Sequence, residues 1–102
     1  MNTQFRAVAF FLILALPAFQ GSASDINNGN RLYQQHCAMC HGASGVSTMA
    51  FAPSFNRGEG LMQSDHSLLN HINTGRNACP AYLGILSEQQ IFDVIAYIRT
   101  FF

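Results

Sequence analysis

The sequence predicts a small all-α domain with three main helices joined by long loops. Three segments repeat apolar residues at helical spacing, and no segment shows the apolar–polar alternation that is typical of a half-buried strand. A chain of 102 residues is long enough for one domain and too short for two.

The N-terminus has the three parts of an export signal. Residues 2–6 are mostly polar and include one arginine, residues 7–19 are almost all apolar, and residues 21–23 are small. The apolar run is shorter than the about 20 residues that span a bilayer, so we expect cleavage rather than a membrane anchor. We therefore expect a cleaved signal peptide over residues 1–23 and a mature periplasmic domain over residues 24–102.

Charge excludes several classes of partner. The chain has five arginines, no lysine and five acidic residues, for a formal net charge of +0. Without a basic stripe we expect no nucleic-acid binding, and without a block of like charges we expect no interaction tail. A hydrophobic content of 49% argues against disorder. We expect a monomer that has no membrane contact after cleavage.

The first helix is expected from about Ser24 or Asp25 to Cys37, with either of the first two residues as N-cap. Gly29 interrupts this segment at a cost of about 1 kcal/mol. A glycine is useful there if another helix approaches closely, although it could also be a plain weak point in the helix.

The second helix is expected over residues 65–74, with Ser64 as N-cap and Gly75 ending it in a left-handed conformation. Residues 42–63, which precede it, contain four glycines and little periodicity. A loop of this length in so small a domain usually wraps around something or is disordered.

The third helix has the best-defined start. Ser87 and Gln90 match a capping box, and Leu86 and Ile91 stand at the positions of a hydrophobic staple. Its apolar face is predicted by the spacing of Ile91, Val94, Ile95 and Ile98.

The sequence that carries chemistry is Cys-Ala-Met-Cys-His at residues 37–41. This C-x-x-C-H pattern is the signature of covalent c-type haem attachment, with Cys37 and Cys40 forming the thioether bonds and His41 as the axial iron ligand. A buried macrocycle would also supply apolar mass that a short chain lacks. A thioredoxin-like pair lacks its strand and helix context, and a zinc site lacks a second ligand pair.

Several separated elements together resemble a class I mono-haem cytochrome c. They are Gly29 and Tyr33, the motif at residues 37–41, Ala52-Pro53, Gly75, residues 79–82, Leu86-Ser87 and residues 94–98. The resemblance implies a small all-α fold around one haem c, electron transfer rather than enzymatic catalysis, and redox partner proteins. It also implies that Gly29 and Tyr33 cross the last helix, and that the Pro53 carbonyl accepts a hydrogen bond from His41.

The chain departs from this family at one position, where Cys79 precedes Pro80 in place of the usual methionine. Three outcomes remain open. Cys79 coordinates the iron as a thiolate, or the iron takes another ligand or none, or Cys79 is an unpaired thiol that forms a mixed disulfide or dimer. The side chains available as other ligands are Met49, Met62, His66 and His71.

Residues 75–82 and 84–86 resemble cytochrome c-55X of denitrifying bacteria. That resemblance implies a role beside cytochrome cd1 nitrite reductase, either in electron delivery or in maturation of its d1 haem. The missing methionine favours a second hypothesis, a haem-based protein that binds or senses nitric oxide at an open distal site. We find no positioned acid–base pair for a peroxidase-like activity, so we expect no catalytic residues.

Overall fold

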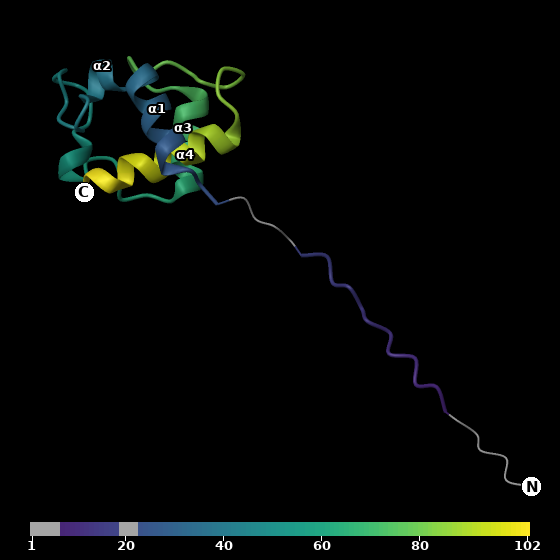
Figure 1. Ribbon diagram of the computed structural model, residues 1–102. Coiled ribbons are helices and arrows are strands. Elements are labelled where there is room, and N and C mark those ends of the chain that lie inside the picture. Colours follow the sequence, from purple (N-terminus) through teal and green to yellow (C-terminus); the bar gives the residue numbers. More distant parts are fainter. Residues whose placement is uncertain (1–6, 19–22) are drawn as a thin grey trace, which may run out of the picture.

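The computed structural model describes residues 7–18 and 23–102 (Figure 1). Within these ranges the chain forms four α-helices and two short 3-10 helices: α1 Ile26–His36, α2 Ala38–His41, η1 Phe55–Arg57, α3 Asp65–Thr74, α4 Glu88–Ile98 and η2 Arg99–Phe101. The same ranges contain no strand, only the isolated bridges Arg76–Cys79 and Leu83–Leu86. The all-α prediction is therefore confirmed.

Residues 7–18 lie apart from the helical domain (Figure 1). Residues 7–18 run away from the helices without regular structure in Figure 1, whereas residues 1–6 and 19–22, with most of the expected cleavage region, lie outside the described residues. In the described part of the chain, no helix has both the length and the apolar character needed to cross a membrane.

The first predicted helix corresponds to α1, and a short helix that was not predicted, α2, follows it. Asp25, not Ser24, is the N-cap of α1, and its side chain accepts a hydrogen bond from the Asn28 main-chain nitrogen at 3.1 Å. The helix ends at His36, one residue earlier than predicted, and Cys37 forms the junction with α2. Because α2 has only four residues, it is too short to produce a periodic pattern in the sequence.

The starts of α3 and α4 are confirmed. Ser64 accepts from the Ser67 nitrogen at 3.1 Å, and Ser87 and Gln90 form both hydrogen bonds of the capping box. Gly75 ends α3 with φ 72° and ψ 164°. This is not the left-handed helical conformation that was predicted, but an extended region open essentially to glycine alone.

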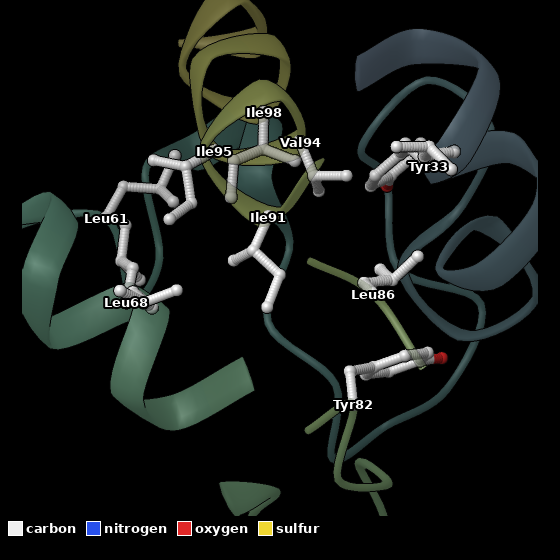
Figure 2. Packing of buried hydrophobic residues seen from close by; sticks show 11 residues of the cluster. Tyr33, Leu61, Leu68, Tyr82, Leu86, Ile91, Val94, Ile95 and Ile98 are labelled. Carbon is white, nitrogen blue, oxygen red and sulfur yellow. The ribbon is translucent and has the colours of Figure 1, made fainter. Parts of the chain in front are cut away.

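The core forms where the first and last helices cross. Gly29 packs against α4 so closely that an added Cβ would overlap the carbonyl oxygen of Asp93. Tyr33 is fully buried beside Tyr97, with ring centroids 5.3 Å apart. The expected crossing is therefore confirmed. Figure 2 shows the buried side chains of α4 between Leu61 and Leu68 on one side and Tyr33 and Leu86 on the other.

The long loop before α3 is fastened to the end of α4 by Arg99. Its Nη1 donates to the Leu61 carbonyl at 2.9 Å and its Nη2 to the Gln63 carbonyl at 2.7 Å. Its Nε donates to the Asp65 carboxylate at 2.9 Å. These contacts place the loop where it can form one wall of the cavity described next.

Candidate cofactor site

A cavity of about 360 Å³ lies between α2, the long loop, α3 and the chain that follows α3. Its lining is mainly apolar, and includes Phe51, Pro53, Phe55, Leu68, Ile72, Tyr82 and Ile98. A smaller hollow of about 60 Å³ is lined by some of the same residues, among them Cys37, His41 and Cys79. The volume and the apolar lining are typical of a site for a cofactor or other small molecule.

Both thiols of the C-x-x-C-H sequence and its imidazole line this cavity. Backbone hydrogen bonds within the turn hold these three residues in place: the nitrogens of Cys40 and His41 donate to the Cys37 carbonyl at 3.2 and 3.0 Å. Burial, and to a smaller extent the nearby Cys79 and Cys40, raise the pKa of the Cys37 thiol to about 12. In the chain without haem, Cys37 is therefore a neutral thiol at physiological pH.

The His41 ring is fixed on two sides. Its Nδ1 lies 3.0 Å from the Pro53 carbonyl oxygen. Because a carbonyl can only accept, this bond places the proton on Nδ1 and leaves the lone pair on Nε2. The ring also stacks on Phe55, with centroids 4.4 Å apart and planes 17° from parallel. The motif thus presents one unprotonated ring nitrogen in a defined orientation.

The sequence carries no separate signal for Phe55. Its stacking on His41 joins residues 14 positions apart in an irregular loop. No spacing in the sequence predicts this stacking. The one nearby residue that the sequence singled out is Pro53, two positions before Phe55.

Two of the side chains considered as a further iron ligand line the cavity, Cys79 and His71. The other three do not: Met62 is 90% exposed, Met49 is 39% exposed, and His66 is exposed beside Phe92. His71 is half-buried where it lines the cavity.

Cys79 lies in a tight turn that closes on Arg76. The nitrogen of Arg76 donates to the Cys79 carbonyl at 3.0 Å, and the nitrogen of Cys79 donates to the Arg76 carbonyl at 2.9 Å. Asn77 within the turn has φ 54°. Burial and the nearby Cys40 raise the pKa of the Cys79 thiol above its ordinary value, although the residue as a whole is exposed.

These features fit haem c. The cavity brings together two thiols for thioether bonds, an imidazole with an available Nε2, and apolar walls for a macrocycle.

Comparison with known proteins agrees with this geometry. Residues 24–98 match the family model described as cytochrome C oxidase, cbb3-type, subunit III. Cytochrome c6 of Synechococcus sp. is 36% identical, over 96% of this chain and 91% of its own length. Cytochrome c6 of Thermosynechococcus vestitus is 34% identical, over 90% of this chain and 83% of its own.

The chain belongs to the class I cytochrome c family. As a member it carries one covalently attached haem c and transfers electrons. The structure of cytochrome c6 from the diatom Phaeodactylum tricornutum superposes with a TM-score of 0.60 at 26% identity, covering 76% of this chain and 93% of that one. The expected class I cytochrome c fold is confirmed.

Proposed function

We propose that this cytochrome is a periplasmic, monomeric one-electron carrier whose haem is bound through Cys37 and Cys40, with His41 as the proximal iron ligand. The observation that carries the proposal is the fixed His41 ring, bonded to Pro53 at 3.0 Å and stacked on Phe55, in the cavity that both thiols line. When bound, the haem supplies an iron that accepts and releases one electron. The chain's contribution is to orient the imidazole, to exclude water from the cavity, and to keep the surrounding side chains in nearly the same positions in both oxidation states.

Covalent attachment is tested on protein from a host competent in cytochrome maturation. Acidified acetone should leave the pigment on the protein, and the intact mass should include one haem. A Cys37→Ala, Cys40→Ala double variant should lose the pigment, whereas Cys79→Ala should retain it. Extraction of the pigment from the unaltered protein would contradict the proposal.

Cys79 is our proposed sixth ligand. It lines the cavity with the other two thiols, whereas no methionine of the described residues does so. A thiolate would neutralise ferric charge and lower the reduction potential relative to a thioether. His71 and an unpaired Cys79 thiol remain the alternatives.

Electron paramagnetic resonance of the ferric protein distinguishes these ligands. Cys79→Ala should abolish the low-spin thiolate signal, while His71→Ala and the exposed-site control Met62→Ala should retain it. A spectrum unchanged in Cys79→Ala would exclude sulfur ligation, and one changed only in His71→Ala would assign the imidazole instead.

The proposed processing separates residues 1–23 from the domain at 24–102. Protein recovered from the periplasm should begin at Ser24 by mass. A chain that keeps residues 1–23 in its mature form would contradict both the domain boundary and the periplasmic location.

The proposed partner is cytochrome cd1 nitrite reductase, either as electron acceptor or as the enzyme whose d1 haem is matured. Support comes from the likeness of residues 75–82 and 84–86 to cytochrome c-55X. Deletion of the gene in a denitrifying host separates the two roles: loss of d1 haem from the reductase indicates maturation, and an intact but unreduced reductase indicates electron delivery. Normal nitrite reduction after deletion would contradict both.

A second function, binding of nitric oxide, is favoured by the exposed Cys79 in place of methionine. A displaceable ligand predicts a changed absorption spectrum when nitric oxide is added to the ferrous protein. A low-spin spectrum that stays the same would exclude this function.

A further inference from the structure

We infer that Glu59 is a positioning residue for the iron ligand. Its carboxylate holds and polarises the peptide group between Pro53 and Ser54, and the oxygen of that peptide group bonds the His41 ring. The inference rests on the proposed role of His41 as the proximal ligand. It adds a charged group that acts on this ligand although Glu59 does not line the cavity.

The peptide group between Pro53 and Ser54 is hydrogen-bonded at both ends. Its oxygen lies 3.0 Å from Nδ1 of His41, and its nitrogen donates to Oε2 of Glu59 at 2.8 Å. The peptide is trans and planar, so its N–H and its C=O point to opposite sides. The carboxylate and the imidazole are therefore joined by two hydrogen bonds that share one peptide group.

Hydrogen bonds that share a peptide group in this way strengthen each other. A carboxylate that accepts from the N–H increases the negative charge on the carbonyl oxygen of the same peptide. That oxygen is then a better acceptor for the Nδ1–H of His41. A ligand imidazole whose other nitrogen donates a stronger hydrogen bond is more basic at Nε2. Glu59 should therefore favour the ferric state, which carries the greater positive charge.

The carboxylate of Glu59 is held in place and ionised. Its Oε1 lies 2.8 Å from Nη2 of Arg57, so each of its two oxygens has a donor of its own. The pKa of Glu59 lies below its ordinary value, chiefly because the Ser54 N–H bonds the carboxylate; slight burial opposes this effect, and the Arg57 cation adds to it. Glu59 is accordingly a carboxylate at neutral pH.

The turn that Glu59 closes supplies both contacts of the His41 ring. Ser54 is only 5% exposed, and its Oγ accepts from the Ser47 nitrogen at 3.0 Å. A buried N–H needs an acceptor, and for the N–H of Ser54 that acceptor is Glu59. The next residue, Phe55, stacks on the imidazole. The carboxylate thus fixes the segment that both bonds and stacks on the ring.

Glu59→Gln separates the charge from the geometry, because an amide oxygen can still accept from the Ser54 N–H. The readout is the Nδ1 proton of His41, followed by NMR in ¹⁵N-labelled, haem-loaded ferrous protein. The sample is kept under carbon monoxide, so that the iron is low-spin whichever group occupies the sixth position. The proton should move upfield in Glu59→Gln, because a weaker hydrogen bond deshields it less. A purely structural role of Glu59 predicts no change.

The reduction potential, measured without carbon monoxide, is the second readout. Loss of the charge in Glu59→Gln should favour the ferrous form, by about a threefold shift in the oxidised-to-reduced ratio at fixed poise, ~28 mV for one electron. The matched control is Glu88→Gln, which removes the same charge from an exposed position in the first turn of α4, away from the cavity lining. It should leave the Nδ1 proton unchanged and shift the potential less.

The hydrogen bond itself is tested in the unaltered protein. With ¹³C and ¹⁵N labels, a coupling across the bond should connect the Ser54 nitrogen with the carboxyl carbon of Glu59, and this measurement decides the matter even if Glu59→Gln fails to mature. Absence of the coupling, or a Nδ1 proton in Glu59→Gln that matches the one in Glu88→Gln, would overturn the role of Glu59 and leave the electron carrier standing. Ring protons of His41 without the large upfield shift that a haem gives its axial ligand would instead overturn the ligand assignment, and both proposals with it.

Discussion

Gly29 of α1 lies directly on the main-chain carbonyl of Asp93 in α4. The contact leaves no room for a side chain and sets how closely the first and last helices approach. It also places the Asp93 side chain beside the start of α1, where it accepts a hydrogen bond from the Asp25 main-chain nitrogen at 2.8 Å.

Gly29→Ala should therefore destabilise the haem-loaded protein although alanine is the better helix former. The added Cβ would overlap the Asp93 carbonyl and also lie 3.0 Å from the Tyr97 Cβ, so the helices have to separate. Overpacking of this kind costs about 3 kcal/mol, measured as the free energy of unfolding in guanidinium chloride. Asn27→Ala, on an exposed position of the same helix, is the control; equal midpoints for the two variants would contradict the close packing.

Stability should also depend on the ionised Asp93 carboxylate. Burial raises its pKa, but the hydrogen bonds from Asn28, the Asp25 nitrogen and Gln89 outweigh burial and hold the pKa below its ordinary value. A pKa lower in the folded than in the unfolded chain gives stability that is present above about pH 4 and is lost as the pH falls through the folded pKa.

Asp93→Asn should accordingly lower the free energy of unfolding by about 1–3 kcal/mol at pH 7. The difference from the unaltered protein should shrink toward pH 3, which is below the ordinary pKa of an aspartate in the unfolded chain. Denaturant unfolding at both pH values checks this. A difference that is the same at pH 3 and pH 7 would show that the charge of Asp93 is not what stabilises the helix contact.

The buried hydroxyl of Tyr33 donates to the Gly42 carbonyl at 2.7 Å. Tyr33→Phe should cost about 1–2 kcal/mol, because it leaves that carbonyl without its buried partner. Tyr97→Phe is a matched control, since the Tyr97 hydroxyl meets an exposed Gln34 amide at 3.4 Å. Thermal unfolding of the two variants should differ clearly, and equal losses would contradict the assignment.

Arg99→Lys should loosen the long loop while keeping the charge. A lysine ammonium cannot reproduce the fork that reaches the Leu61 and Gln63 carbonyls together with Asp65. We expect faster amide hydrogen exchange in residues 58–64 than in the unaltered protein, with little change in α1. Arg31→Lys on the exposed face of α1 should leave exchange in the loop as it was, and protection that persists in Arg99→Lys would contradict the role of the fork.

Local chemistry made part of this structure predictable. The N-caps Ser64 and Ser87 and the capping-box residue Gln90 depend on neighbours three positions away, so the sequence alone located the starts of α3 and α4. The C-x-x-C-H residues are likewise contiguous. The close approach of Gly29 to the last helix was predictable because the resemblance to a known fold indicated which helix crosses there.

The remainder depends on contacts between distant residues. Phe55 stacks on His41 because an irregular loop brings the two residues together. His71 lines the cavity because of how α3 is rotated about its axis, and the apolar pattern of α3 alone does not specify that rotation. The conformation of Gly75 likewise follows from the turn at residues 76–79, which presses Ala81 and Cys79 against it.

The crossing of α1 and α4 joins the earliest and the latest helices of the domain to leave the ribosome. Helix α4 supplies the surface against which Gly29 packs, and Arg99, which follows α4, holds the loop by the Leu61 carbonyl. Cys37 and Cys40 therefore lie in a cavity whose enclosure depends on contacts made by the last part of the domain to be synthesised.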